Sequence, residues 1–217
     1  MGNLYSVQRA CEHVEVRAVV TSSPDIVLSA AGVVLPGVGA MPDAMETLDV
    51  TGLSAALRLV VQRGTPLFGV CLGLQLLMRE GSEFRPHAGL GLIEGRVVRF
   101  EGHADNGRPL RVPHIGWNAV QRVGAVPAAW SGTPLASTAD GTYMYFVHSY
   151  YVVPEDPGVV VATARYGDVE FCAALRRGNT FACQFHPERS GPAGLEVYRA
   201  FGALVAAHAA RPERRAS

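Results

Sequence analysis

The segment PLFGVCLGLQLLMRE, residues 66–80, places a cysteine between two glycines where one residue pattern gives way to another. Residues 66–70 form a short, continuous apolar run, which is typical of a strand buried on both faces of a parallel sheet. From Leu72 to Glu80 the pattern is that of a helix. The segment therefore predicts a buried strand, a tight turn at Cys71 and a helix directly after it.

The residues before this segment show the same alternation of helix and strand. Residues 3–13 and 52–64 carry apolar side chains at helical spacing, and Gly64 closes the second of these helices. Residues 15–20 (EVRAVV) read as a short strand, and residues 31–41 (AGVVLPGVGAM) as a strand that runs into a loop. Such alternation favours an α/β fold built on a central sheet.

The second half of the sequence is mostly strand-like, with turn residues between the strands. Six stretches have this pattern: 91–100, 116–123, 143–153, 158–167, 169–178 and 181–185. The last two read as a hairpin that turns at Arg177–Asn179. An amphipathic helix at 194–208 completes a single domain spanning 1–208, and we expect residues 209–217 to be a disordered tail.

Composition excludes several classes of function. The chain has 217 residues, of which 48% are hydrophobic, enough to bury a sizeable core in one globular domain. Its formal net charge is zero, so no basic patch indicates nucleic acid as a partner. It contains no lysine, which excludes Schiff-base chemistry on a lysine. No segment reads as a signal peptide or as an apolar run of about 18 residues that could span a membrane.

The cysteines are Cys11, Cys71, Cys172 and Cys183, and they lie far apart in the sequence. No pair has the CxxC spacing of a metal or redox site, so we expect neither a metal nor a disulfide. A reducing, cytoplasmic setting is the simplest interpretation. We expect Cys11, Cys172 and Cys183 to be small core residues.

Cys71 has a second interpretation. At a strand end beside a helix N-terminus, unpaired backbone N–H groups favour a nearby anion and therefore the thiolate. Gly69 and Gly73 leave room for a strained turn and for close approach of a substrate, as in a nucleophile elbow. From this segment alone, a buried cysteine in a glycine-rich turn fits equally well.

The segment QFHPERS, residues 184–190, favours the nucleophile. His186 and Glu188 follow an apolar strand that Pro187 stops, so both side chains lie where a sheet meets a loop. A neutral histidine can take the thiol proton, and a carboxylate on its other nitrogen fixes its tautomer and orientation. Taken alone, HPE is more typical of a surface turn. Together with Cys71 it indicates a nucleophile, a base and an orienting group, as in thiol acyl transfer.

At this point the sequence resembles a known family. GVCLGLQLL (69–77) followed by QFHPE (184–188) is similar to the class I (triad) glutamine amidotransferases. LPGVGAM (35–41), PHIGWN (113–118) and YFVHSYYV (145–152) resemble, more narrowly, the glutaminase subunits of imidazole glycerol phosphate synthase. The resemblance extends from Gly2 to about His208.

The resemblance implies a fold and an activity. The fold is flavodoxin-like, a mixed and mostly parallel central sheet flanked by helices, with a smaller antiparallel sheet. The activity is hydrolysis of L-glutamine to glutamate and ammonia, without a cofactor. The ammonia is delivered to a (β/α)8-barrel synthase (cyclase) subunit in histidine biosynthesis, and neither nucleic acid nor a membrane is involved.

The resemblance also implies roles for residues of this chain. The catalytic residues are Cys71, His186 and Glu188. The oxyanion hole involves Leu72, Val38 and Gly39. The glutamine-holding positions are Gly73, Gln75, Ser149 and Tyr150. The subunit interface and ammonia exit involve Trp117, Asn118, Tyr145 and Arg189, the last of which stands where the family commonly has lysine.

Other interpretations stay open for several of these residues. By spacing alone, Gln75 is an exposed or half-buried helix residue, and Trp117 and Tyr145 are core aromatics. His148, mid-strand on the face shared with Phe146 and Tyr150, reads as a structural histidine whose hydrogen bonds are satisfied. For the whole chain, the alternatives are the glutaminase component of anthranilate or aminodeoxychorismate synthase, a thiol hydrolase or chaperone-like member of the same fold, and a non-catalytic binding module.

The sequence departs from the family at its start. Members begin with a hydrophobic strand before the helix that resembles residues 2–10, whereas this chain starts at Met1. We expect the first strand to be missing, which leaves unpaired strand edges and an uncovered apolar face. A start site assigned one strand too late is the explanation we favour.

Overall fold

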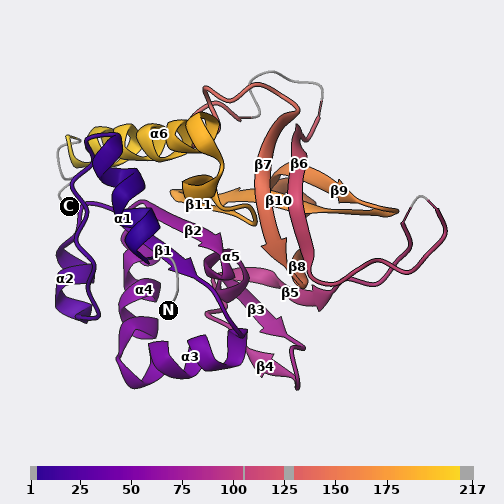
Figure 1. The fold of residues 1–217 in the computed structure, drawn as a ribbon. Helices are drawn as coiled ribbons and strands as arrows, with labels where there is room; N and C mark the ends of the chain where they lie inside the picture. Colours follow the sequence, from indigo (N-terminus) through magenta and orange to yellow (C-terminus); the bar gives the residue numbers. More distant parts are fainter. Residues whose placement is uncertain (1–3, 105, 125–129, 211–217) are drawn as a thin grey trace.

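The computed structural model describes residues 4–104, 106–124 and 130–210, which form two β-sheets flanked by helices (Figure 1). The larger sheet has the strands β1 (Val33–Gly37), β2 (Leu67–Cys71), β6 (His114–Arg122), β7 (Thr142–His148), β9 (Val160–Tyr166), β10 (Val169–Arg177) and β11 (Thr180–Cys183). Their order across the sheet is β1-β2-β11-β10-β9-β6-β7. The smaller sheet has the strands β3 (Met78–Gly81), β4 (His87–Ala88), β5 (Ile93–Arg99) and β8 (Tyr150–Pro154) in the order β4-β3-β5-β8.

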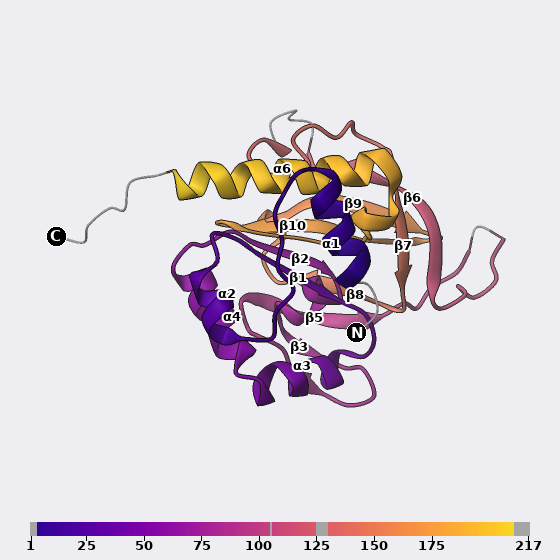
Figure 2. The ribbon, with the colours of Figure 1, turned by 60° about the vertical axis from the view of Figure 1, so that its left-hand side comes forward.

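Helices cover both faces of the larger sheet around its parallel strands β1, β2 and β11 (Figure 2). On one face lie α1 (Leu4–His13) and α6 (Gly191–Ala209), and on the other lie α2 (Pro24–Ser29), α3 (Met41–Val50) and α4 (Leu53–Gln62). Shorter pieces are α5 (Leu72–Leu76) and the 3₁₀ turns η2 (Pro157–Val159) and η3 (Pro187–Arg189). None of the helices in the described ranges is long and apolar enough to cross a membrane.

The central strand β2 is buried on both faces, as its apolar run predicts. Phe68 and Val70 belong to the core under α1 and α6, whereas Leu67 belongs to the core under α3 and α4. All of its residues are buried. Successive side chains of a strand point to opposite faces, so one strand contributes to two cores.

The predicted mixed sheet, its flanking helices and the second, smaller sheet are confirmed. The balance of strand directions differs from the expectation, because only β1, β2 and β11 pair in parallel in the larger sheet. Strand β10 is antiparallel to both of its neighbours, and β6 is antiparallel to β7 and β9. The smaller sheet is also mixed, since β3 pairs in parallel with β5. The hairpin between β10 and β11 is confirmed, with Arg177 opposite Thr180.

Two predicted elements are wrong. The helix predicted from Leu72 to Glu80 ends at Leu76, because the chain then pairs as β3 with β5, where Met78 lies opposite Ile93. The strand predicted at 15–20 has no regular structure. Its sequence has strand propensity, but residues 15–20 pair with no described strand. The strand β1, at the edge of the larger sheet, pairs only with β2 among the described strands. Without a neighbouring strand, propensity alone does not form one.

The remaining boundaries are close to those predicted. The stretch 143–153 is divided at Ser149 into β7 and β8, which belong to different sheets. Helix α6 continues to Ala209. The tail predicted at 209–217 lies outside the described residues from 211 onward.

Phe68 offers a test of the core under α1 and α6. Its ring is fully buried, with ring centroids 5.4, 5.7 and 5.3 Å from those of Phe181, Tyr198 and Phe201. We predict that Phe68→Ala lowers the free energy of unfolding by about 3–5 kcal/mol, because it removes buried contacts and leaves a cavity. Urea unfolding measures this. Phe84→Ala, at a phenylalanine that is 85% exposed, is the matched control and should change it by less than about 0.5 kcal/mol.

Candidate active site

Cys71 stands at a strained turn between β2 and α5. It is the last residue of β2, and its φ of 54° and ψ of −107° lie outside the regions that side-chain-bearing residues prefer. Gly73, two residues later, allows the turn to pack closely against β1. A Cβ atom on Gly73 would lie 1.8 Å from the backbone oxygen of Leu35 in β1. The sequence GVCLG therefore forms an elbow that holds the sulfur at the end of a buried strand.

His186 and Glu188 lie on the turn that follows β11. The imidazole Nδ1 is 2.7 Å from Oε1 of Glu188, and the two side chains are only 3% and 1% exposed. The other carboxylate oxygen accepts a hydrogen bond from the hydroxyl of Tyr198, at 3.3 Å. Because a carboxylate accepts hydrogen bonds, Nδ1 carries a proton. Nε2, on the side of the ring away from Glu188, is therefore the nitrogen that can exchange a proton with another group.

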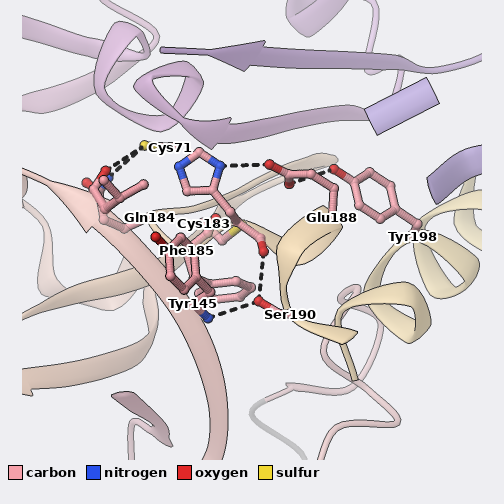
Figure 3. Close-up of polar contacts among 10 residues, drawn as sticks. Cys71, Tyr145, Cys183, Gln184, Phe185, Glu188, Ser190 and Tyr198 are labelled. Carbon is pink, nitrogen blue, oxygen red and sulfur yellow. Dashed lines mark hydrogen bonds and ion pairs between the residues drawn. The ribbon is translucent and has the colours of Figure 1, made fainter. Parts of the chain in front are cut away.

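Parallel pairing brings Cys71 and His186 to the same place. In the pairing of β2 with β11, Val70 lies opposite Cys183, so both strands end at the same edge of the sheet. Cys71 and His186 line one cavity there. Figure 3 shows Cys71, Glu188 and Tyr198 in one row across this edge. The predicted nucleophile, base and orienting group are therefore neighbours, although more than 100 residues separate Cys71 from the other two.

The charge state of His186 follows from these neighbours. Burial alone lowers its pKa, but hydrogen bonding to Cys71 and Glu188 and the charges of both groups outweigh burial and raise the pKa to about 10. No hydrogen bond of strict geometry joins the buried Nε2 to a described residue, so the contact with Cys71 that raises the pKa is imperfectly formed. Catalytic contacts are often long in free enzymes and shorten in complexes.

The cavity beside Cys71 has a volume of about 280 Å³. It is lined by most of the residues expected to bind glutamine or the oxyanion: Val38, Gly39, Leu72, Gln75, Ser149 and Tyr150. Gly73 is not part of the lining. Gln75 is only 6% exposed, so the interpretation as an exposed helix residue is wrong. Its amide is instead bonded to the Tyr150 carbonyl at 2.9 Å.

Two polar residues near the cavity were not predicted. Glu83 lines it, and its carboxylate accepts a hydrogen bond from the backbone nitrogen of Met41 at 2.8 Å. Gln184 is fully buried, and its Nε2 donates to the sulfur of Cys71 at 3.5 Å. Gln184 belongs to the motif QFHPE, so its position next to the predicted base was a signal. No spacing in the sequence points to Glu83.

His148 is a structural histidine, as one interpretation of the sequence had it. Its Nδ1 is 2.8 Å from the backbone oxygen of Tyr150, and its Nε2 is 3.1 Å from Nδ1 of His114. Burial lowers the pKa of His148 to about 3, so the ring is neutral. Although it lines the cavity, both nitrogens are occupied and neither can take the proton of Cys71.

Three of the four residues expected at the interface lie together at an outer face on β6 and β7. Trp117 lies opposite Tyr145, and their rings are 6.0 Å apart. The guanidinium of Arg189 lies 4.5 Å above the Tyr145 ring. Trp117 is 51% exposed, so the interpretation as a core aromatic is wrong. Asn118 does not join this face, because its side chain bonds to His114 and to the backbone oxygen of Arg165.

Ser190 joins this outer face to the turn that carries His186 and Glu188, here called the catalytic turn (Figure 3). Its hydroxyl donates to the backbone oxygen of His186 at 2.7 Å and accepts from the backbone nitrogen of Tyr145 at 3.0 Å. The nitrogen of His186 in turn donates to the oxygen of Tyr145 at 2.8 Å. Tyr145 and His186 are thus held together by hydrogen bonds in both directions.

The sequence and the fold are similar to those of known proteins. The profile of the family "Glutamine amidotransferase class-I" matches residues 2–203. A crystal structure of a glutamine amidotransferase superposes with a TM-score of 0.69 at 20% identity, covering 94% of this chain and 95% of the other. The structure of PurLQS from Thermotoga maritima superposes with a TM-score of 0.67 at 18% identity, covering 92% of each chain. At these identities the two structures support the fold alone.

Relatives of higher identity narrow the family. The HisH subunit of imidazole glycerol phosphate synthase from Geobacter sulfurreducens is 45% identical over 205 residues, which is 94% of this chain and 95% of the relative. The subunit of the same name from Syntrophotalea carbinolica is 48% identical over 203 residues, covering 93% and 95%. The chain therefore belongs to the class I glutamine amidotransferases and, within that class, to the family of the HisH subunits.

Replacing Glu188 tests the charge arrangement of the triad. We predict that Glu188→Gln lowers the glutaminase rate by about 10²-fold or more, since the imidazole loses the charge that supports its proton. The raised pKa of His186 stabilises the fold fully below about 6.5, and this contribution is lost as the pH rises through about 10. The difference in unfolding free energy between the unaltered chain and Glu188→Gln should therefore shrink from pH 6.5 to 10. Glu155→Gln, at an exposed glutamate, is the control.

A flat difference across this pH range would contradict the assignment of the proton to His186. Denaturant titrations of both variants and of the unaltered chain, at several pH values, provide the comparison.

Proposed function

We propose that this chain is the glutaminase subunit of an imidazole glycerol phosphate synthase and that it acts in histidine biosynthesis. The observation that carries the proposal is the convergence of Cys71, His186 and Glu188 beside a cavity. Its relatives named as HisH subunits support the choice within the class. The four cysteines are unpaired, which fits a cytoplasmic enzyme.

The triad supports hydrolysis of the side-chain amide of L-glutamine in two steps. The thiol of Cys71 first gives its proton to Nε2 of His186, whose raised pKa favours the imidazolium, and the resulting thiolate attacks the amide carbon. His186 then gives this proton to the departing nitrogen, which leaves as ammonia, and a thioester remains on Cys71. Water, activated by the same imidazole, attacks the thioester and releases glutamate.

The end of β1 is suited to supply the oxyanion hole. Gly37 lies opposite Cys71 in the pairing of β1 with β2, so the PGVG loop begins beside the elbow. The backbone N–H of Leu72 would be one donor. The N–H of Val38 or Gly39 would be the second after a peptide rotation, which Gly39, already at a φ of 103°, accommodates. Losing one such donor typically lowers the rate by about 10²–10³-fold, so this rotation would switch the glutaminase between a slow and a fast state.

The chain works as a subunit together with a synthase subunit, and we propose that this partner is a (β/α)8 barrel that receives ammonia through a closed passage. In water, ammonia takes up a proton and loses its nucleophilic lone pair. The outer face on β6 and β7 is the surface proposed for docking. Ile115, Trp117 and Tyr143 there are 60%, 51% and 62% exposed. Apolar exposure of this kind marks an interaction site.

Arg189 stands next to this face and next to the triad. We propose that its guanidinium, which lies over Tyr145, pairs with a carboxylate of the synthase subunit. Tyr145 is hydrogen-bonded to His186 through the backbone. Docking at this face would thus act on β7, whose residue Tyr145 is hydrogen-bonded to the catalytic base His186.

We predict low glutaminase activity for the isolated chain and strong stimulation by the synthase subunit with its ligand bound. The reason is that the second oxyanion donor is supplied only after the PGVG loop rotates. Release of glutamate, measured with and without the synthase subunit, tests this. Equal rates in both assays would contradict the switch in the oxyanion hole.

Replacing the nucleophile separates the two reactions of the complex. We expect Cys71→Ala to abolish synthesis that depends on glutamine, because no thioester can form. Synthesis from added ammonia should continue at the rate of the unaltered complex, since the synthase site is untouched. If both syntheses were lost, Cys71 would instead have a role in folding or docking. Cys172→Ala, at another buried cysteine, is the control for the loss of a thiol.

A further inference from the structure

Gln184 lies directly beside the nucleophile. It follows β11 and is fully buried. Because Cys183 pairs with Val70, the next residues along the two strands, Gln184 and Cys71, are neighbours at the end of the sheet. The Nε2 of Gln184 is 3.5 Å from the sulfur, and its Oε1 is 3.2 Å from Nε2 of Gln75.

The direction of these hydrogen bonds is fixed by a backbone group. The two ends of a glutamine amide have the same shape, so the partners decide which end is nitrogen. The backbone oxygen of Tyr150 can only accept, so the Gln75 atom at 2.9 Å from it is Nε2. This same nitrogen faces Gln184, whose near atom must therefore be oxygen. The far end of Gln184, an N–H group, then points at the sulfur.

A second donor holds the same carbonyl. Nδ1 of His148 lies 2.8 Å from the Tyr150 oxygen and must carry its proton there. Nε2 of His148, which lies 3.1 Å from Nδ1 of His114, then carries the lone pair of the neutral ring. Gln75 and His148 together occupy both lone pairs of the Tyr150 oxygen, so this oxygen is a fixed anchor and not a free binding group.

We propose that Gln184 is a further catalytic residue of this site, whose amide N–H stabilises the thiolate of Cys71. The proposal deepens the proposed glutaminase function and rests on it. The thiol proton still passes to His186, and Gln184 transfers none. Gln75 donates to the oxygen of the same amide, which polarises its N–H groups toward the sulfur. Hydrogen bonds to an ionised acceptor are about twice as strong as those to a neutral one.

The alternative is that Gln184 only fills space and satisfies Gln75. The two roles differ in one measurable quantity, the dependence of thiol reactivity on pH. Only the thiolate reacts with iodoacetamide, so a lost N–H donor moves the reaction of Cys71 to higher pH. A residue that only fills space changes stability and leaves this profile in place.

The variant Gln184→Met keeps the length of the side chain and removes the donor. We expect the alkylation rate of Cys71, located by mass spectrometry, to fall about tenfold at neutral pH and to approach that of the unaltered chain at high pH. Gln184→Glu, which places a carboxylate beside the sulfur, should shift the profile further. Gln62→Met, at an exposed glutamine of α4, should leave it unchanged. Coincident profiles for Gln184→Met and the unaltered chain would overturn the proposal.

A measurement on the unaltered chain guards against variants that do not fold. Blocking Cys71 as a mixed disulfide removes the charge on sulfur, so one side-chain amide proton of Gln184 should shift in the NMR spectrum, whereas those of Gln62 should not. An unchanged Gln184 signal would also overturn the proposal. Alkylation and NMR need neither glutamine nor the synthase subunit. A chain that shows both effects but hydrolyses no glutamine in the complex would refute the proposed function alone.

Discussion

The parallel pairing of β2 with β11 is the constraint on which the site depends. It places Cys71 at the end of one strand and Gln184 and His186 just past the end of its neighbour. Parallel strands end at the same edge of a sheet, so residues far apart in the chain meet there without any special loop. The strands are buried on both faces by α1 and α6 on one side and by α3 and α4 on the other. The cores therefore hold the reacting groups in place as well as the fold.

Much of this arrangement could be predicted from the sequence because its signals are local. The apolar run before Cys71, the glycines around it and the proline after His186 each specify a strand end or a turn. The failures have a physical cause as well. Residues 76–78 are apolar and suit a helix or a strand, and pairing with β5 decided for the strand. Residues 15–20 have strand propensity but no described neighbour with which to pair.

The polar groups behind the nucleophile could not be predicted in the same way. Gln75 and Gln184 are 109 residues apart, and Gln75 and Tyr150 are 75 apart, so no spacing in the sequence reveals that they meet. Glu83 was missed for the same reason. What connects them is a requirement that only the folded structure expresses, namely that buried amides find partners. The backbone oxygen of Tyr150 meets this requirement for Gln75 and His148 together.

The catalytic turn has a second effect on the larger sheet, which ends at β7. An edge strand normally offers free N–H and C=O groups to any other strand that approaches, and proteins cover such edges to avoid aggregation. At Tyr145 both groups are already taken, by the hydroxyl of Ser190 and the backbone of His186. The turn that carries the base thus also occupies hydrogen-bonding groups at the edge of the sheet, where another strand could otherwise pair. Damage to this turn would cost solubility as well as chemistry.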